Sequence, residues 1–251
     1  MRKQKLLPEK CRVLSGSALK LIAVVTMLID HIACYTVSHG CVLFTIGSRR
    51  VLLYTVMRII GRISFPLFAF LLVEGFVHTR NRIRYGFSLL LCAFISEVPW
   101  DLLHRGRLFY AEQNVFFTLT LGFLGMCAVE YLRYRPIAQF IAILVFGIVS
   151  VLIKSDYTIR GYTFIMLLYA LRENEILRVL PFFVLKNYWF ALGAFIPISL
   201  YNGKRGFIKG NVLKYSFYAF YPVHLLVLYF IRLANGFTKT FCPHRAYAAA
   251  Y

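Results

Sequence analysis

Apolar runs long enough to cross a lipid bilayer dominate this chain. A transmembrane helix needs about 20 mainly apolar residues. Six stretches meet that requirement: Ala18–Val37, Val51–His78, Tyr85–Leu103, Asn114–Leu132, Pro136–Ile153 and Tyr215–Leu233. A seventh region, from Ile159 to Tyr201, is apolar but interrupted, with Lys186 and Asn187 at one junction, and it predicts two or three more crossings. We therefore predict an all-α, polytopic helical membrane protein with about eight or nine transmembrane helices.

The composition leaves little room for a soluble domain. Hydrophobic residues make up 60% of the chain and charged residues 16%, whereas roughly 25% of a soluble domain is charged. The polar breaks between the apolar runs are short. We predict a single transmembrane domain over residues 1–236, followed by an unstructured C-terminal tail over residues 237–251.

The net charge of +19 lies largely in the breaks between apolar runs. Lys and Arg at those positions orient membrane proteins, with the basic loops on the cytoplasmic side. The richest clusters are at residues 2–12, 80–84, 133–135 and 204–209, and they favour a cytoplasmic N-terminus. The charge therefore does not call for a nucleic-acid partner. The six cysteines show no CxxC spacing, so we expect no metal site.

Ionisable residues inside the first span indicate a functional site or a structural ion pair, because charges at bilayer depth are costly. Lys20 and His31 are eleven positions apart, which places them on one helix face about 16 Å apart along the axis. Asp30 lies about 100° around the helix from His31, so it is better placed to face a neighbouring helix. A neutral imidazole can accept a proton from a nucleophile near neutral pH. A histidine in a helix–helix hydrogen bond is the structural alternative.

The second span carries Arg58 and Arg62 four positions apart, hence on one face. Two guanidinium groups can clamp phosphate or carboxylate groups. Alternatively, they neutralise buried acidic residues, because buried charges require partners; the candidates are Asp30, Glu74, Glu97 and Asp101.

Two further positions hold polar candidates. Glu97 and Asp101 share a helix face near the end of the third span; they could raise the basicity of a catalytic histidine, receive an acceptor amine, or pair with the arginines. His224 follows Pro222 in the last span and either points into the same cavity or packs between helices. The chain has no GxSxG, P-loop or HExxH motif, so hydrolase, NTPase and zinc chemistry lack support.

Several motifs in order resemble the TraX family of bacterial membrane proteins, whose conjugative-pilus namesake is associated with N-terminal acetylation of pilin. They are Leu19-Lys20-Leu21-Ile22-Ala23, Met27-Leu28-Ile29-Asp30-His31-Ile32, Gly61-Arg62-Ile63-Ser64-Phe65-Pro66-Leu67-Phe68-Ala69-Phe70, Ser96-Glu97-Val98-Pro99-Trp100-Asp101, Asn114-Val115-Phe116-Phe117-Thr118, Asp156-Tyr157 with Gly161-Tyr162, and Phe220-Tyr221-Pro222-Val223-His224. They extend over nearly the whole chain.

The family in turn resembles the wider transmembrane acyltransferases, including the acyltransferase type three group. In that group a basic residue, ten intervening positions and a histidine mark the first span; Lys20 and His31 fit, with lysine where many relatives place arginine. The resemblance implies an acetyltransferase that uses acetyl-CoA or another acyl-CoA as donor, with His31 as the base. The expected catalytic residues are His31, Asp30, Glu97 and Asp101, and the expected donor-binding residues are Lys20, Arg58, Arg62 and His224.

The acceptor stays open at this stage. The resemblance implies that the acceptor is a protein N-terminus such as that of pilin. It also implies that the chain is a multi-pass protein of the bacterial inner membrane, in contact with membrane lipids. One alternative is O-acetylation of a cell-envelope glycan or glycolipid, because the same base serves amines and hydroxyls. The other is a transporter or a pilus-assembly component without enzymatic activity, in which the buried charges form a relay or a structural network.

Overall fold

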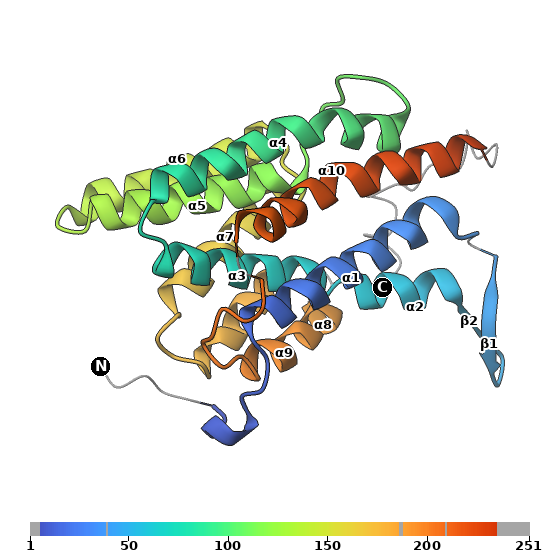
Figure 1. Ribbon diagram of the computed structural model, residues 1–251, viewed down its shortest axis with the longest axis horizontal. Helices are drawn as coiled ribbons and strands as arrows, with labels where there is room; N and C mark the ends of the chain where they lie inside the picture. The colour runs from blue at the N-terminus through green and yellow to red at the C-terminus, as the bar shows by residue number, and fades with distance from the viewer. Residues whose placement is uncertain (1–5, 39, 186–187, 209, 235–251) are drawn as a thin grey trace.

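The computed structural model describes residues 6–38, 40–185, 188–208 and 210–234. Most of them lie in helices (Figure 1). The long helices are α1 (Gly16–Thr36), α2 (Leu53–Gly61), α3 (Ser64–His78), α4 (Arg82–Arg105), α5 (Val115–Tyr131), α6 (Pro136–Leu152), α7 (Thr158–Ala170) and α10 (Asn211–Ala234). The short elements are η1 (Glu9–Cys11), β1 (Val42–Ile46), β2 (Arg49–Leu52), η2 (Leu177–Val184), α8 (Tyr188–Ala191), η3 (Leu192–Ala194) and α9 (Phe195–Ser199).

Four helical segments are long and apolar enough to cross a membrane: Gly16–Thr36, Leu53–His78, Arg82–Arg105 and Tyr215–Ala234. The helices Val115–Tyr131 and Pro136–Leu152 are apolar but shorter. All six spans expected from the apolar runs therefore correspond to helical segments. A mostly helical membrane protein is confirmed, whereas the count of eight or nine crossings is not.

The interrupted region between Ile159 and Tyr201 forms one helix of 13 residues, α7, followed by short segments. Pro181 lies inside η2 and Pro197 inside α9. Proline lacks a backbone N–H and disrupts a continuing helix, so the described part of this region contains no helix of spanning length. The predicted junction at Lys186 and Asn187 lies outside the described residues, as does the tail predicted from residue 237 onward.

A β-hairpin between α1 and α2 departs from the all-α prediction. Strand β1 pairs antiparallel with β2, and Gly47 between them has a φ of 58°. Glycine adopts that left-handed conformation without steric cost. The residues of β1, Val42-Leu43-Phe44-Thr45-Ile46, are mostly β-branched or aromatic, which favours an extended strand over a helix.

The two ends of the bundle differ in the loops they carry. In Figure 1 the turns that join α3 to α4 and α5 to α6 lie at the left end, whereas the β-hairpin and the loop between α4 and α5 lie at the right end. The arginines of residues 80–84 and 133–135 therefore share one end. Which side of a membrane that end faces stays a prediction.

The outer surface of the helices is apolar. Along α6 the exposed side chains include Ile137, Phe140, Ile141, Leu144, Val145 and Ile148. On α4 they include Phe87 and Phe94, with 65% and 61% of their surface exposed. Soluble proteins rarely expose continuous apolar faces, so these faces fit a lipid environment.

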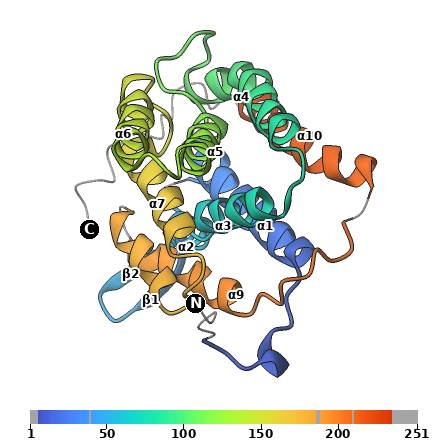
Figure 2. The same cartoon turned by 90° about the vertical axis from the view of Figure 1, so that its left-hand side faces the viewer.

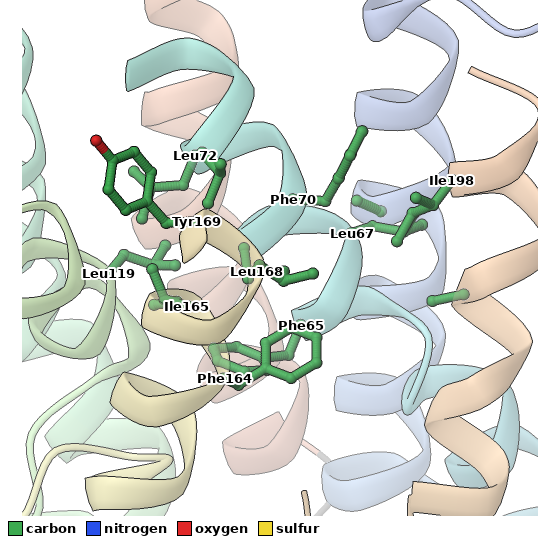
Figure 3. Close-up of a cluster of buried hydrophobic side chains, with 14 of the residues drawn as sticks. Phe65, Leu67, Phe70, Leu72, Leu119, Phe164, Ile165, Leu168, Tyr169 and Ile198 are labelled. Atoms are coloured by element: carbon green, nitrogen blue, oxygen red, sulfur yellow. The ribbon is translucent and has the colours of Figure 1, made fainter. Parts of the chain in front are cut away.

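The main core surrounds α3. Phe65, Leu67, Phe70 and Leu72 of this helix pack against Phe164, Ile165, Leu168 and Tyr169 of α7, against Leu119 of α5 and against Ile198 of α9 (Figure 3). Glycine permits the close approach of α5 to α7, because a Cβ on Gly122 would lie 2.7 Å from Cδ1 of Ile165. A second, smaller cluster joins α1, α4 and α10 and includes Met27, Leu103 and Leu225. The two clusters hold the helices that carry the polar candidates.

Candidate functional site

Two histidines from distant parts of the sequence meet between α1 and α10. His31 Nδ1 lies 2.7 Å from His224 Nε2. The two rings stack, with centroids 5.0 Å apart and an interplanar angle of 5°. His224 is buried, with 5% of its surface exposed, and His31 is partly buried. The structure therefore brings together a predicted catalytic residue and a residue that was expected to bind the donor.

The hydrogen-bond partners fix the proton positions of this pair when both rings are neutral. His224 Nδ1 lies 2.9 Å from the carbonyl oxygen of Phe220. A carbonyl oxygen only accepts, so His224 Nδ1 carries the hydrogen and His224 Nε2 is an acceptor. His31 Nδ1 must then donate to it. This assignment leaves His31 Nε2 as the basic nitrogen, and His224 orients the ring.

Lys20 and His31 both contact α10, and their spacing had predicted only that they share one face of α1. The Lys20 ammonium lies 5.4 Å from the ring centroid of Phe217 in α10. Eleven residues of helix separate the two side chains by about 16 Å along the axis. Lys20 is thus near the start of α1, at a distance from the histidine pair.

Asp30 faces α2 and not α10. Its Oδ2 accepts a hydrogen bond of 2.6 Å from Arg58 Nη1, and its Oδ1 lies 3.6 Å from Arg62 Nη2. All three side chains are largely buried. The contact of Arg58 therefore corresponds to the second reading of the arginines, in which they neutralise buried acidic residues, and not to an anion clamp. Asp30 neutralises an arginine and does not contact His31 in any of the hydrogen bonds between described residues.

Gly61 makes this contact between α1 and α2 possible. A Cβ at Gly61 would lie 2.1 Å from Oδ1 and 2.4 Å from Cβ and Cγ of Asp30. Atoms cannot approach so closely without a shift of the backbone or the side chain. Only glycine at this position lets Asp30 reach between the two arginines.

Glu97 and Asp101 bind backbone and amide groups around the loop between α4 and α5. Glu97 Oε2 accepts hydrogen bonds from the backbone N–H of Asn114, at 3.3 Å, and from its side-chain amide. Asp101 Oδ2 accepts from the backbone N–H of Tyr110 at 3.0 Å. Asn114 caps α5 through the N–H of Phe116. Among the described residues neither carboxylate joins an ion pair, so the predicted alternative of arginine partners is not supported.

Several buried polar atoms near these elements have no hydrogen-bond partner within the described part of the chain. They are Ser96 Oγ, Glu97 Oε1, Asp101 Oδ1, Thr118 Oγ1 and the hydroxyl of Tyr221. Buried polar atoms in proteins are normally paired, so this group can accept or donate hydrogen bonds to a bound molecule. The ring of Tyr221 lies 5.4 Å from that of His224 and 6.4 Å from that of His31.

Asp156, between α6 and α7, is a further member of the site that spacing arguments missed. Its carboxylate interacts electrostatically with Arg62, Asp30 and Arg58. Burial raises the pKa of Asp156 to about 7, and the charge of Arg62 opposes that rise. The adjacent Tyr157 stacks on Phe65 of α3 with ring centroids 3.7 Å apart. Both residues belong to one of the motifs of the family resemblance, which was the one signal that could have found them.

Comparison with known proteins identifies the family. The family model described as TraX protein matches residues 15–232. The chain belongs to the TraX family. A relative described as "Probable fimbrial assembly protein FimC, serogroup H1", from Dichelobacter nodosus, is 30% identical over 243 residues, which cover 85% of this chain and 94% of the relative. No solved structure matches.

Family membership confirms the resemblance that the motifs indicated. In this TraX-family protein, motif residues that are far apart in the sequence converge on one region. The histidine pair joins α1 to α10, and the ion pair joins α1 to α2. Glu97 links α4 to the start of α5. A base, a cationic group and carboxylates with unpartnered oxygens together can carry out acid–base chemistry on a bound substrate.

Proposed function

We propose that this TraX-family protein is a membrane-embedded acetyltransferase that moves an acetyl group from acetyl-CoA to the amine of a protein N-terminus, such as that of a pilin subunit. The observation that carries the proposal is the hydrogen bond between His31 and His224, which leaves His31 Nε2 as a base of fixed orientation. Family membership and the name of the fimbrial relative support a role connected with pili.

In the proposed reaction His31 Nε2 takes a proton from the acceptor amine while the nitrogen of that amine attacks the thioester carbonyl carbon. The new C–N bond forms and the C–S bond breaks, so the products are an amide and the thiolate of CoA. The proton on His31 then passes to that thiolate. Each turnover restores the neutral histidine, so no other reactant is needed. Throughout these reaction steps His224 holds the ring of His31 by accepting a hydrogen bond from its Nδ1.

The other candidates fit supporting roles in that reaction. Lys20 lies near the start of α1, about 16 Å along the helix from His31, which suits an elongated donor with phosphates at one end and a thioester at the other. The unpartnered oxygens of Glu97 and Asp101 can accept hydrogen bonds from an amine. Arg62 lies farther from Asp30 than Arg58 does but also interacts with Asp156, so it sits between two carboxylates and we assign it a positioning role.

The test is transfer of isotopically labelled acetyl from acetyl-CoA to a pilin N-terminal peptide by the purified protein. Removal of a general base lowers the rate by roughly 10²–10⁴, and we expect that loss for His31→Ala. We expect His224→Ala to lower the rate and to shift its pH profile. His78→Ala is the matched control, because His78 is an exposed histidine on α3. Wild-type turnover by His31→Ala would refute the assignment.

Acetylation of a glycan hydroxyl uses the same base and is the first alternative. Mass spectrometry of envelope polysaccharide and of pilus proteins, with and without the gene, distinguishes the two acceptors. A non-enzymatic assembly role is the second alternative, favoured by the relative's name. It would be supported if the label reaches no macromolecule while pilus assembly still depends on the protein.

A further inference from the structure

A cavity of about 520 Å³ lies between α5, α6 and α7, apart from the histidine pair. Its apolar wall includes Ile143, Met166 and Leu167. Its polar wall includes Arg133, Gln139 and Arg172. None of these residues takes part in the proposed acetyl transfer. Figure 2 shows α5, α6 and α7 on one side of the bundle and α1 and α10 on the other.

The charge at this cavity is positive. Arg133 is exposed, and Arg172 donates a 2.8 Å hydrogen bond to the carbonyl oxygen of Tyr169 while its Nε lies 3.7 Å from Glu173 Oε1. A guanidinium has five N–H donors, so Arg172 keeps donors for another group. The acidic residue of the wall, Glu130, accepts a hydrogen bond from the hydroxyl of Tyr169. Arg82 also interacts electrostatically with Tyr169, so three arginines face two carboxylates, Glu130 and Glu173, around this cavity.

The position of the cavity matches the headgroup region of a membrane. Arg133 lies in the turn between α5 and α6, and Arg172 follows the end of α7. This turn belongs to the end of the bundle that also carries the arginines of residues 80–84 (Figure 1). Anionic headgroups attract basic residues at the membrane surface, where each contributes about 1 kcal/mol. Ile143 lies about two turns into α6 from Pro136, and with Met166 and Leu167 it provides an apolar surface for an acyl chain.

We propose that the α5–α7 cavity binds one anionic phospholipid, with its phosphate between Arg133 and Arg172 and part of an acyl chain along Ile143 and Leu167. The arrangement of basic residues above an apolar wall recognises a lipid that has both a phosphate and a chain. It takes no part in the acetyl transfer and therefore stands independently of the proposed function.

The test is lipid binding to the delipidated, detergent-purified protein by native mass spectrometry. Phosphatidylglycerol and phosphatidylcholine with identical chains are compared. We expect phosphatidylglycerol to bind about tenfold more tightly, because its headgroup has a net negative charge, whereas the choline cation of phosphatidylcholine neutralises the phosphate. Loss of a charge-assisted hydrogen bond weakens binding about tenfold or more, so Arg133→Gln with Arg172→Gln is expected to remove that preference. Arg135→Gln is the control, because Arg135 is exposed in the same turn and does not line the cavity.

Three results would overturn the proposal. Equal binding of the two lipids would mean that the cavity holds ordinary annular lipid. Unchanged preference in the double variant would mean that the anionic lipid binds elsewhere. Displacement of phosphatidylglycerol by CoA would assign the cavity to the acyl donor. Size-exclusion profiles check that the variants fold, and if the double variant does not, Arg133→Gln alone provides the same comparison at an exposed position.

Discussion

Replacement of Gly61 by alanine tests the helix contact that holds Asp30 and Arg58 together. The added Cβ would lie 2.4 Å from the Cβ and Cγ of Asp30. Carbon atoms in contact are about 3.5–4.0 Å apart, so the two helices must separate by about 1.1–1.6 Å. Rotation of the Asp30 side chain does not relieve the clash, because its Cβ is fixed to the backbone of α1.

A separation of that size breaks the ion pair. The hydrogen bond between Arg58 and Asp30 is 2.6 Å long, and about 1 Å more takes it beyond hydrogen-bonding distance. Overpacking costs about 1–3 kcal/mol, and loss of a largely buried ion pair adds to that cost. Alanine gains roughly 1 kcal/mol of helix propensity over glycine, which offsets a part. We expect a net destabilisation of about 2 kcal/mol or more.

Thermal unfolding in detergent measures the effect. For a chain of this size 1 kcal/mol corresponds to roughly 2–4 °C, so Gly61→Ala is expected to lower the apparent Tm by about 4–8 °C. Gly40→Ala is the control, because the nearest atom to its Cβ, Ser38 Oγ, is 3.9 Å away. Adding Asp30→Gly to Gly61→Ala removes the clashing atoms and is expected to restore part of the loss. An unchanged Tm for Gly61→Ala would refute the reasoning.

Three further predictions concern groups around the site and at the opposite end. Because burial raises the pKa of Asp156 to about 7, the folded protein binds more protons than the unfolded chain between roughly pH 4 and 7, and stability falls as pH rises through that window; Asp156→Asn should remove this slope in Tm measured against pH. Burial alone would raise the pKa of Glu175, but the hydrogen bond from Arg12 outweighs it and lowers the pKa, so Arg12→Ala should lower the Tm at pH 7 and progressively less below about pH 4. Asn114→Ala removes the cap of α5 and a partner of Glu97 and should cost about 1–2 kcal/mol in unfolding measurements.

The apolar runs predicted the helices well, because the bilayer imposes both their length and their composition. The prediction was less complete where local backbone preferences, such as those of β-branched residues and proline, compete with the hydropathy pattern. The β-branched residues of β1 form a strand just before the predicted second span. After α7, the prolines at positions 181 and 197 divide an apolar region into short helices. Hydropathy averaged over 20 residues does not register a single proline.

Local spacing predicted part of the site and could not predict the rest. The shared face of Lys20 and His31 follows from 3.6 residues per turn, and both residues contact α10. The partner of His31, however, is 193 positions away in the sequence. Such a pairing depends on how α10 packs against α1, and the helical periodicity of the sequence does not predict that packing. The same holds for Asp156, whose neighbours Arg62 and Asp30 come from other helices.

The basic residues that were expected to bind the donor lie in two separate places in the structure. Asp30 and His31 share one turn of α1 but face different helices, so the arginines pair with the α2 side of that turn, whereas Lys20 lies toward the start of α1. In the proposed reaction, a donor whose thioester reaches His31 would have its phosphates toward Lys20, about 16 Å away along α1. Arg58 is neutralised at 2.6 Å, whereas Arg62 lies 3.6 Å from the same carboxylate. Arg62 also interacts with Asp156, so both arginines face carboxylates, and Lys20 is the basic residue of this group that lies apart from them near the start of α1.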